Sequence, residues 1–299
     1  MNWDDLKVFL HVGRSSSLTA SSKKLKMDPS TLGRRIARLE ERMGARLFVK
    51  TPQGYDLTDA GQRLLVYADE MEQSSLSAQE IVQGPTDQMS GVIRIGAPDG
   101  SANFLLPEVC AEISKENPDL EIQIVAIPRV LNLSKREADM AVTVSPPQAG
   151  RLVVQKVTDY QLHLAATKAY IAAHPDLRKF EQIKQHPIIG YIPDLIFDKE
   201  LDYLSEFGLK PSPSLASNSV SVQINMINQG AGLGVVHDFA MPNFPDLQFL
   251  FKEELAITRS FYLVRHEGDR RVGRFNRFAE RLIKGMRDVV KSKEAVKPA

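Results

Sequence analysis

The chain has 299 residues, of which 43% are apolar and 25% are charged, close to the average for folded water-soluble proteins. This composition excludes a disordered chain, and the length favours about two domains. The sequence contains no run of 18 or more apolar residues, which excludes a membrane-spanning helix and a membrane partner.

Charge is distributed unevenly, although the net charge is only +1. Residues 20–50 hold nine Lys and Arg against three acids, a local charge of +6. Residues 61–90 hold one Arg against five acids, a local charge of −4. A basic head before an acidic connector favours a negatively charged partner for the head, such as nucleic acid.

The cysteine content and the N-terminus predict a reducing compartment. The single cysteine, Cys110, can form no internal disulfide, and the six histidines lack the spacing of metal ligands. The first residues lack the basic start and the apolar block of a secretory signal. We therefore expect a cytoplasmic protein with no metal and no cofactor.

The first 57 residues predict three helices and a small hairpin. Asn2 and Ser17 are suited to cap the first two helices, and Asp28 followed by Pro29 is typical of the start of the third. Gly44 ends that third helix. The elements expected after it are a strand, a turn and a second strand, at 47–49, 51–54 and 55–57.

The third helix has two chemically different faces. Apolar side chains recur at steps of four, three and four and form one stripe, made by Leu32, Ile36, Leu39 and Met43. Polar and basic side chains lie on the opposite side or on its flank, namely Ser30, Thr31, Arg34, Arg38, Arg35 and Arg42. A short helix followed by a helix with a polar, Arg-bearing start is what a helix-turn-helix needs to enter the major groove. The residues alone leave an alternative open, which is an ordinary basic helix face in solvent.

Thr58 begins a long polar helix that is predicted to reach Gln83. Residues at alternating steps of four and three form a heptad seam along it, namely Leu64, Ala68, Met71, Ser75, Ala78 and Val82. We expect the helix to dimerise through the five apolar residues of this seam. Because the seam has few large apolar side chains, the later domains are expected to contribute contacts.

Beyond residue 91, strand-like runs alternate with helix-like stretches. The expected strands are 92–95, 121–127, 141–144, 162–165, 188–191, 233–236 and 261–264. The expected helices include 104–114 and 220–228. This alternation predicts an α/β region with mainly parallel strands, and its length suits two small subdomains.

The order and spacing of several motifs resemble those of one family. In the head they are Ser17-Leu18-Thr19, Thr31-Leu32-Gly33-Arg34-Arg35-Ile36, Leu39-Glu40-Glu41, Gly44-Ala45-Arg46-Leu47-Phe48 and Leu57-Thr58-Asp59-Ala60-Gly61. In the later region they are Leu106-Pro107, Ala138-Asp139-Met140-Ala141-Val142 and Gly230-Ala231-Gly232-Leu233-Gly234-Val235. Over nearly its whole length, the chain resembles the LysR-type transcriptional regulators.

The resemblance implies an α+β multidomain protein. It would have an N-terminal winged helix-turn-helix, a long linker helix and a two-lobed α/β effector domain like a periplasmic binding protein. The expected bounds are 1–57 for the DNA-binding domain, 58–90 for the linker, 91–160 with 267–290 for subdomain I, 161–266 for subdomain II and 291–299 for a flexible tail.

The positions of these residues in a LysR-type head suggest their roles. Base edges would be read by Ser30, Thr31 and Arg34, because these side chains lie near the start of the helix that enters the groove. The expected phosphate contacts are Ser17, Arg35, Arg38 and Lys50. Gln53, at the tip of the wing, is expected either to reach the minor groove or to be a plain turn residue.

The effectors of the resembled family lie in a cleft between two subdomains, where strands meet helix starts. The matching positions here are Gly100, Ser101, Ala102, Asn103, Pro128, Thr143, Ser217, Asn218 and Ser219. Hydroxyl and backbone N–H groups at helix starts hold oxyanions, so we expect a small organic anion or a similar metabolite. For Ser101, a role as a plain helix cap stays open, and the charge of Asp99 would oppose an anion.

The resemblance also implies partners. These are double-stranded DNA with imperfect inverted repeats near promoters, a small-molecule effector and further copies of the chain in a homodimer or homotetramer. Contact with RNA polymerase is compatible with it. In this mechanism the effector closes the cleft and changes the placing of the DNA-binding heads.

Two alternatives to an effector-controlled regulator stay open. One is a constitutive DNA-binding protein whose α/β domain serves only oligomerisation. The other is an enzyme that uses the cleft, for which the sequence gives little support. The glycines at 230, 232 and 234 follow a helix and precede a strand, the reverse of a dinucleotide-binding fingerprint. Neither Gly-x-Ser-x-Gly nor His-Glu-x-x-His is present.

Overall fold

The chain folds into two compact units, and each is described by itself. The computed structural model describes residues 2–52, 54–83, 88–126, 137–147, 150–209 and 213–295. The first unit comprises the N-terminal segment up to residue 87 and two short later segments, and the second comprises the remainder. Within the described residues, no helix is both long enough and apolar enough to cross a bilayer.

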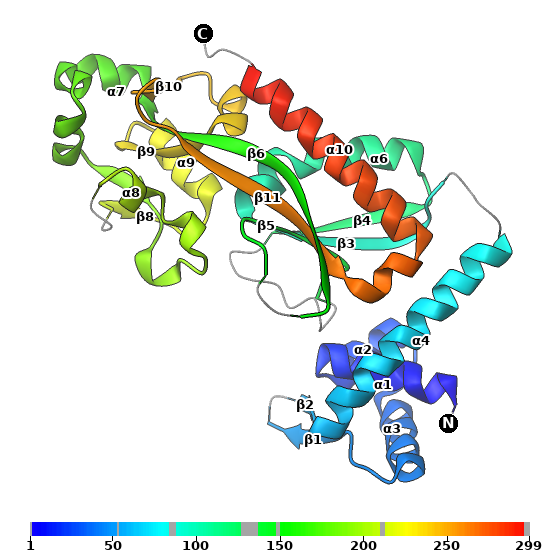
Figure 1. Ribbon diagram of the computed structural model, residues 1–299. Coiled ribbons are helices and arrows are strands. Elements are labelled where there is room, and N and C mark those ends of the chain that lie inside the picture. Colours follow the sequence, from blue (N-terminus) through cyan, green and yellow to red (C-terminus); the bar gives the residue numbers. More distant parts are fainter. Residues whose placement is uncertain are drawn as a thin grey trace. The chain divides into compact units, whose positions relative to one another are not determined.

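The described residues of the first unit up to Gln83 form three helices, a hairpin and a long helix (Figure 1). They are α1 (Trp3–Ser15), α2 (Leu18–Leu25), α3 (Pro29–Met43), β1 (Phe48–Thr51), β2 (Gly54–Leu57) and α4 (Asp59–Gln83). The expected caps of α1 and α2 are confirmed, because Asn2 and Ser17 accept hydrogen bonds from the backbone of their helices at 3.0 and 3.2 Å. Asp28 makes no such side-chain bond, so Pro29 is the residue that favours the start of α3.

Phe9 of α1 lies in the middle of the first unit's core. It is fully buried, and its ring centroid lies 5.3 Å from that of Phe48 on β1. The other buried apolar residues of this core are Leu6, Val8, Leu10, Val12, Leu32, Ile36, Leu39, Leu47 and Ala68. The apolar stripe predicted for α3 therefore faces the core, apart from Met43 at its end, which is 42% exposed. Burial of this stripe leaves the polar face of α3 outside.

Glu40 joins the end of α3 to the start of β1. Its side chain is buried and accepts hydrogen bonds from the backbone N–H groups of Leu47 at 2.8 Å and Phe48 at 3.2 Å. Arg46 donates a third bond at 2.8 Å. Because a buried carboxylate is costly without donors, these contacts hold the hairpin against α3.

α4 is held against the head by charge and by close packing. Arg14 of α1 forms ion pairs with Asp69 and, at 2.7 Å, with Glu72, both on α4. A Cβ atom added to Gly61, in the first turn of α4, would lie 2.2 Å from the carbonyl oxygen of Leu47. Only glycine permits this approach, so the start of α4 packs directly on the backbone that precedes β1.

The second unit is built on a mixed sheet. Its strands are β3 (Gly91–Ala97), β4 (Leu120–Ala126), β5 (Met140–Thr143), β6 (Leu152–Thr167), β7 (Ile188–Gly190), β8 (Leu215–Ala216), β9 (Leu233–His237), β10 (Leu247–Leu250) and β11 (Ile257–His266). Their order is β4-β3-β5-β11-β6-β9-β7-β8, and β10 also pairs with β6. β3 is parallel to β4 and β5, and β7 is parallel to β8 and β9, whereas β5–β11, β6–β9 and β6–β10 are antiparallel. The predicted parallel pairing holds toward the ends of the sheet and is wrong in its middle.

The α-helices of the second unit are α5 (Asp99–Phe104), α6 (Leu106–Glu116), α7 (Lys168–Ala173), α8 (Tyr203–Glu206), α9 (Val220–Asn228) and α10 (Gly273–Ala295). The prediction for α9 is confirmed at both ends. The helix expected at 104–114 corresponds to α6, which begins two residues later, because the backbone breaks at Leu105 and Pro107 lies in the first turn. β8, β10 and most of the length of β6 were not expected.

The long strands β6 and β11 belong to both halves of the sheet (Figure 1). Tyr262–Arg265 of β11 pairs with β5, whereas Leu162–Thr167 of β6 pairs with β9 and β10. We define the first half as β3, β4 and β5 with α5 and α6, and the second half as β7 to β10 with α9. The two halves are therefore connected through the two central strands.

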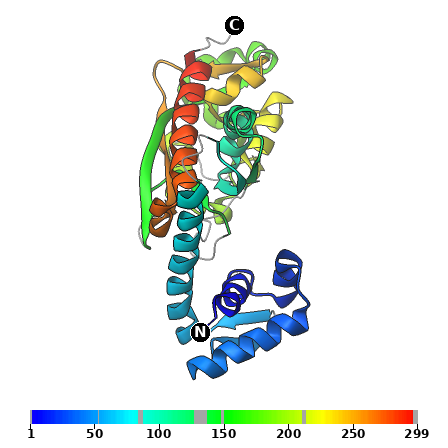
Figure 2. The same ribbon diagram turned by 90° about the vertical axis from the view of Figure 1, so that its right-hand side faces the viewer.

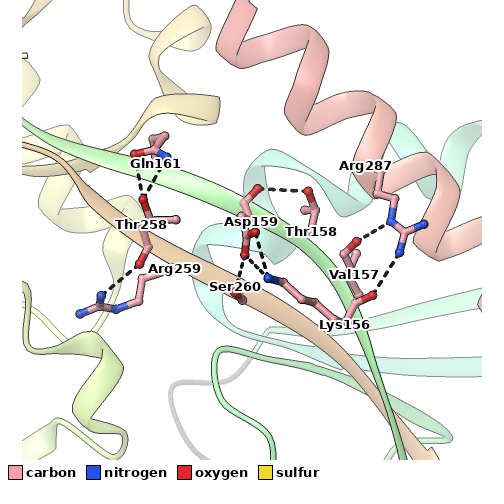
Figure 3. A network of polar contacts seen from close by, with 9 residues as sticks. All are labelled: Lys156, Val157, Thr158, Asp159, Gln161, Thr258, Arg259, Ser260 and Arg287. Atoms are coloured by element: carbon pink, nitrogen blue, oxygen red, sulfur yellow. Dashed lines mark hydrogen bonds and ion pairs between the residues drawn. The ribbon is translucent and has the colours of Figure 1, made fainter. Parts of the chain in front are cut away.

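Polar side chains lie along these central strands (Figure 3). Asp159 of β6 accepts a hydrogen bond from Ser260 of β11 at 2.5 Å and forms an ion pair with Lys156 at 2.7 Å. α10 runs alongside β6 (Figure 2), and its Arg287 donates to the backbone carbonyl of Lys156 at 3.2 Å and to that of Val157. These contacts tie β6, β11 and α10 together.

Replacing Glu40 by alanine should destabilise the first unit. The substitution leaves two buried N–H groups of the hairpin without their acceptor, which should lower the free energy of unfolding by about 1–3 kcal/mol. Trp3 packs against the first unit's core, so its fluorescence reports urea unfolding of this unit. Glu41→Ala is the matched control, because Glu41 is exposed on the same helix. Equal transitions for the two variants would show that Glu40 does not hold the hairpin.

Candidate functional site

The outward face of α3 is polar and basic. Ser30, Arg34 and Arg38 are exposed, and Thr31 is half-buried. Arg34 donates a hydrogen bond of 3.4 Å to the hydroxyl of Thr31, three residues earlier on the same face. The face lies opposite the buried stripe of α3, so its side chains are presented to an external partner by the packing of the core.

Arg35 is placed differently from the other predicted phosphate contacts. Its guanidinium lies 3.9 Å from carboxylate oxygens of both Asp4 and Asp5 on α1. Arg42 lies 3.7 Å from the other oxygen of Asp5, whose side chain is only 1% exposed. These long ion pairs place positive charge near the buried carboxylate of Asp5, so Arg35 has an intramolecular role that the helical wheel does not reveal.

The remaining predicted contacts of the head lie outside α3. Ser17 is the N-cap of α2, where its hydroxyl already accepts from the backbone N–H of Ala20. Lys50 is exposed on β1. Gln53, the predicted wing-tip residue, lies outside the described residues. The structure thus places Ser17 and Lys50 at the surface of the head, as a phosphate contact requires.

The seam predicted on α4 divides into two parts. Ala68 is fully buried and Leu64 is partly buried, and both pack against the first unit's core. Met71 is 40% exposed and Val82 is 86% exposed, and Ala78 is exposed as well. Tyr67, which the heptad pattern did not select, is 65% exposed. In the described part of α4, the outward apolar residues are therefore those of its later part, together with Val66 and Tyr67.

The starts of α5 and α9 meet between the two halves of the second unit. Asp99 is the first residue of α5, and its Oδ2 atom accepts three hydrogen bonds from the start of α9. The donors are the hydroxyl of Ser219 at 3.0 Å and the backbone N–H and hydroxyl of Ser221 at 2.8 and 2.9 Å. From the sequence, the charge of Asp99 was expected to oppose an anion, and no role was predicted for Ser221.

The predicted effector-binding residues near Asp99 are largely engaged within the protein. Ser101 is fully buried, and its hydroxyl donates to the backbone carbonyl of Pro98 at 3.0 Å. Asn103 donates its amide to the Oδ1 atom of Asp99 at 3.1 Å. Gly100 and Ala102 are buried. The helix start is therefore closely packed and internally hydrogen-bonded.

The other predicted cleft residues come from separate segments of the chain. On the second half, Ser217 accepts from the backbone N–H of Ser219 at 3.1 Å, and Asn218 lies between them, half-buried. On the first half, Thr143 at the end of β5 donates to the backbone carbonyl of Ser145 at 2.7 Å. Pro128 lies outside the described residues. The structure brings Asp99 and the 217–219 segment together, whereas it binds Thr143 into a local turn.

A buried aromatic cluster lies beside these helix starts. His237, at the end of β9, stacks with Tyr160 at 5.5 Å between ring centroids and contacts Phe239 at 4.9 Å. A Cβ atom at Gly100 would lie 3.5 Å from the His237 ring, so α5 packs directly on this cluster. Burial lowers the pKa of His237 to about 3, and burial raises the pKa of Tyr160 well above its usual value. The cluster is therefore electrically neutral at physiological pH.

The second half also contains a small pocket. Its lining is mostly apolar and includes Tyr191, Tyr203 and Gln223. The Tyr203 hydroxyl is buried and interacts with the hydroxyl of Tyr160. Burial raises the pKa of Tyr203, and the pKa of Tyr191 is raised by burial and by the nearby charges of Tyr203 and Asp99. Asp202 also lines the pocket, which therefore offers a ligand no positive charge.

The sequence predicted neither a catalytic nucleophile nor a metal site. Cys110 is buried on α6, and burial raises the pKa of its thiol to about 12, so it is a core residue rather than a nucleophile. In the parts of the chain that the structure describes, there is no group of three or more His, Cys, Asp or Glu side chains placed to hold a metal ion.

Two family models match the chain. Residues 3–62 match a model described as "Bacterial regulatory helix-turn-helix protein, lysR family", and residues 86–287 match one described as "LysR substrate binding domain". The first match covers α1 to β2 and the start of α4. The second covers most of the second unit, including the starts of α5 and α9.

Individual relatives match over most of their length. The regulator CrgA of Neisseria meningitidis is 23% identical over 81% of both chains. The structure of a full-length OxyR variant from Pseudomonas aeruginosa has a TM-score of 0.70 at 15% identity, over 96% of this chain and 98% of that one. Full-length LysG of Corynebacterium glutamicum, solved with its bound effector Arg, has a TM-score of 0.66 at 17% identity, over 96% and 99%. At these identities the two structures show a shared fold.

The stability of the second unit should decrease in acid because of His237. The folded protein keeps the ring neutral down to about pH 3, whereas the unfolded chain binds a proton below about pH 6.5. The neutral ring makes its full contribution to the free energy of unfolding above pH 6.5. This contribution decreases by about 1.4 kcal/mol per pH unit as the pH falls toward 3. His237→Phe keeps an aromatic ring without the titrating group. Between pH 7 and pH 5, its melting temperature by circular dichroism should fall less than that of the wild type, and parallel curves would contradict this.

Proposed function

The chain belongs to the LysR family of bacterial transcriptional regulators, and on that premise we propose that it reads operator DNA with α3 and responds to a small molecule bound in its second unit. The observation that carries the proposal is the division of α3 into a buried apolar stripe and an exposed face with Arg34 and Arg38. This division leaves hydrogen-bonding side chains free of the core at the start of the helix, where a recognition helix contacts base edges.

We assign two kinds of DNA contact to the head. Base edges are read by Ser30, Thr31 and Arg34, and the bond between Arg34 and Thr31 aligns the guanidinium along the helix start. Phosphates are contacted by Ser17, Arg35, Arg38 and Lys50, of which Arg38 and Lys50 are the more exposed. The protein would act in the cytoplasm on imperfect inverted repeats, with one head on each half-site.

Substitution of Arg34 should reduce sequence specificity. Arg34→Ala removes the only base-reading arginine of the assignment, which should cost about 1–3 kcal/mol on the specific operator and relax the preference at one base position. The operator is first identified by selection from random duplexes, and affinity is then measured on specific and random DNA. Arg151→Ala, an exposed arginine of the second unit, is the control.

Substitution of Arg38 should weaken binding to all sequences alike. Arg38→Ala removes one phosphate contact, so the slope of log affinity against log salt should decrease by about one for each head. Titrations at several salt concentrations measure this slope. If Arg34→Ala and Arg38→Ala behave identically on specific and random DNA, the division between reading and positioning is wrong. If wild-type protein selects no DNA sequence, the proposed function is wrong.

We propose that a second copy of the chain covers the outward apolar residues of α4. Tyr67, Met71, Ala78 and Val82 recur at steps of four, seven and four, which places them on one face of the helix. Leu64 and Ala68 of the predicted seam are instead part of the first unit's core. The later domains would complete the dimer, or a tetramer made of two dimers, because this face has few large side chains.

Charge placed on this face should weaken dimerisation and operator binding together. Met71→Glu combined with Val82→Glu introduces two carboxylates that a partner helix would have to bury. Sedimentation velocity measures the oligomeric state, and Trp3 fluorescence shows that the head remains folded. Leu64→Glu is the contrasting variant, because it should unfold the head itself. An unchanged oligomer in the double variant would remove α4 from the interface.

The effector is proposed to bind between subdomain I (91–160 with 267–290) and subdomain II (161–266). The family match to a substrate-binding domain supports an effector site, and the meeting of α5 and α9 supports its position. A constitutive regulator is the second candidate, and one observation favours it. Asp99 already occupies the place at the start of α9 where an anionic effector was expected.

A further inference from the structure

Asp99 makes the contact that the carboxylate of a ligand would make. Its Oδ2 atom accepts from the backbone N–H of Ser221 at 2.8 Å, in the first turn of α9, and from the hydroxyls of Ser219 and Ser221. Unpaired N–H groups and the helix dipole make this position favourable for an anion. Asp99 comes from the first half of the sheet and α9 from the second, so the contact spans the space between the halves.

The carboxylate is held on both of its oxygens. Asn103 donates to Oδ1 at 3.1 Å, and it also donates to the backbone carbonyl of Asp99 at 2.9 Å. The side-chain hydroxyl of Ser219 is at once a donor to Asp99 and the cap of α9, where it accepts from the N–H of Val222 at 3.3 Å. Asp99 is therefore fixed by its own helix on one side and by α9 on the other.

The surroundings of Asp99 do not favour a second anion. Gly100 packs against His237, whose low pKa keeps its ring neutral, and Ser101 is fully buried. The groups that contact Asp99 in the described part of the chain are hydroxyls and amides. A ligand carboxylate at this place would meet the negative charge of Asp99 at short range, which is repulsive in a partly buried site.

We propose that Asp99 is an internal substitute for an anionic effector. Its carboxylate occupies the anion position at the start of α9 and holds the two halves together without a ligand, so that small carboxylates do not bind there in the wild type. This inference rests on the proposed function, which places an effector site in the cleft between the two subdomains. It further implies that any effector of the wild type approaches as a neutral or positively charged molecule, or must displace Asp99.

The test removes the side-chain carboxylate of Asp99 by substitution and supplies a free carboxylate ion in solution to replace it. Asp99→Gly vacates the CH₂–COO⁻ group, and formate is a carboxylate small enough to enter that space. Without formate, the melting temperature of the full chain should be lower than that of the wild type by about 3–8 °C. Sodium formate should restore at least half of this loss, measured against sodium chloride at equal ionic strength.

Two control variants make the formate result specific. The wild type and Asp99→Asn should respond to formate no more than to chloride, because a side chain fills the site in both. Ser219→Ala combined with Ser221→Ala keeps the carboxylate and removes two donors, so it should lower the melting temperature without creating a formate response. Adding this pair to Asp99→Gly should abolish most of the formate response, because the donors are shared.

Several outcomes would overturn the proposal. These are an Asp99→Gly variant that melts like the wild type, or a shift with formate that is equal in Asp99→Gly, Asp99→Asn and the wild type. If Asp99→Gly does not fold, the variant Ser219→Ala with Ser221→Ala is the test. A melting temperature of this variant equal to that of the wild type would contradict a bridging role for Asp99. Operator binding is measured separately on the wild type, so failure of the proposed DNA-binding function remains distinguishable from failure of this proposal.

Discussion

The hydrogen bonds between the carboxylate of Asp99 and the start of α9 join the two halves of the second unit, and in our proposal they hold these halves together. Among the described residues, the two halves of its sheet are continuous through β6 and β11. Away from these strands, polar contacts between the halves include those where α5 meets α9 and the hydrogen bond that Ser145, after β5, donates to Asp198, between β7 and β8. A carboxylate against a helix N-terminus is strong because the N–H groups there have no partner within the helix. Whatever changes this contact changes how the halves meet.

The first unit uses the same chemistry for a different purpose. Glu40 of α3 accepts from two backbone N–H groups at the start of the hairpin, as Asp99 accepts from α9. In both cases a side chain from one element satisfies backbone donors of another. In the head this fixes the hairpin against α3, and in the second unit it fixes one half against the other.

The sequence predicted the head well because its signals are local. Caps, Pro29 and the stripe on α3 depend on residues within one or two turns, and the structure confirms the helix bounds they imply. The seam on α4 shows the limit of periodicity. An apolar residue such as Ala68 has the same spacing whether it packs on its own core or on a partner, and only the fold shows that it is buried. The pairing of Arg35 with two acids of α1 is missed for the same reason.

The structure brings some of the residues predicted to bind an effector close together, but their hydrogen bonds differ from those expected. Ser219 and Asn103 lie where the resemblance expected a ligand, but both bond to Asp99. The partner of Asp99 lies 120 residues away in the chain, and no local pattern specifies which distant N–H group meets a given carboxylate. β8, β10 and the length of β6 escaped prediction because short or amphipathic strands gain their stability from neighbours in the sheet.

A crystal structure of the Asp99→Gly variant grown with formate would show whether a carboxylate at the start of α9 holds the two halves together. We expect a formate ion there, with one oxygen accepting from the backbone N–H of Ser221 and from the hydroxyls of Ser219 and Ser221. The two halves should be in contact as in the wild type. Halves in the same contact with only water at that place, or formate bound elsewhere, would contradict the claim that a carboxylate holds them together.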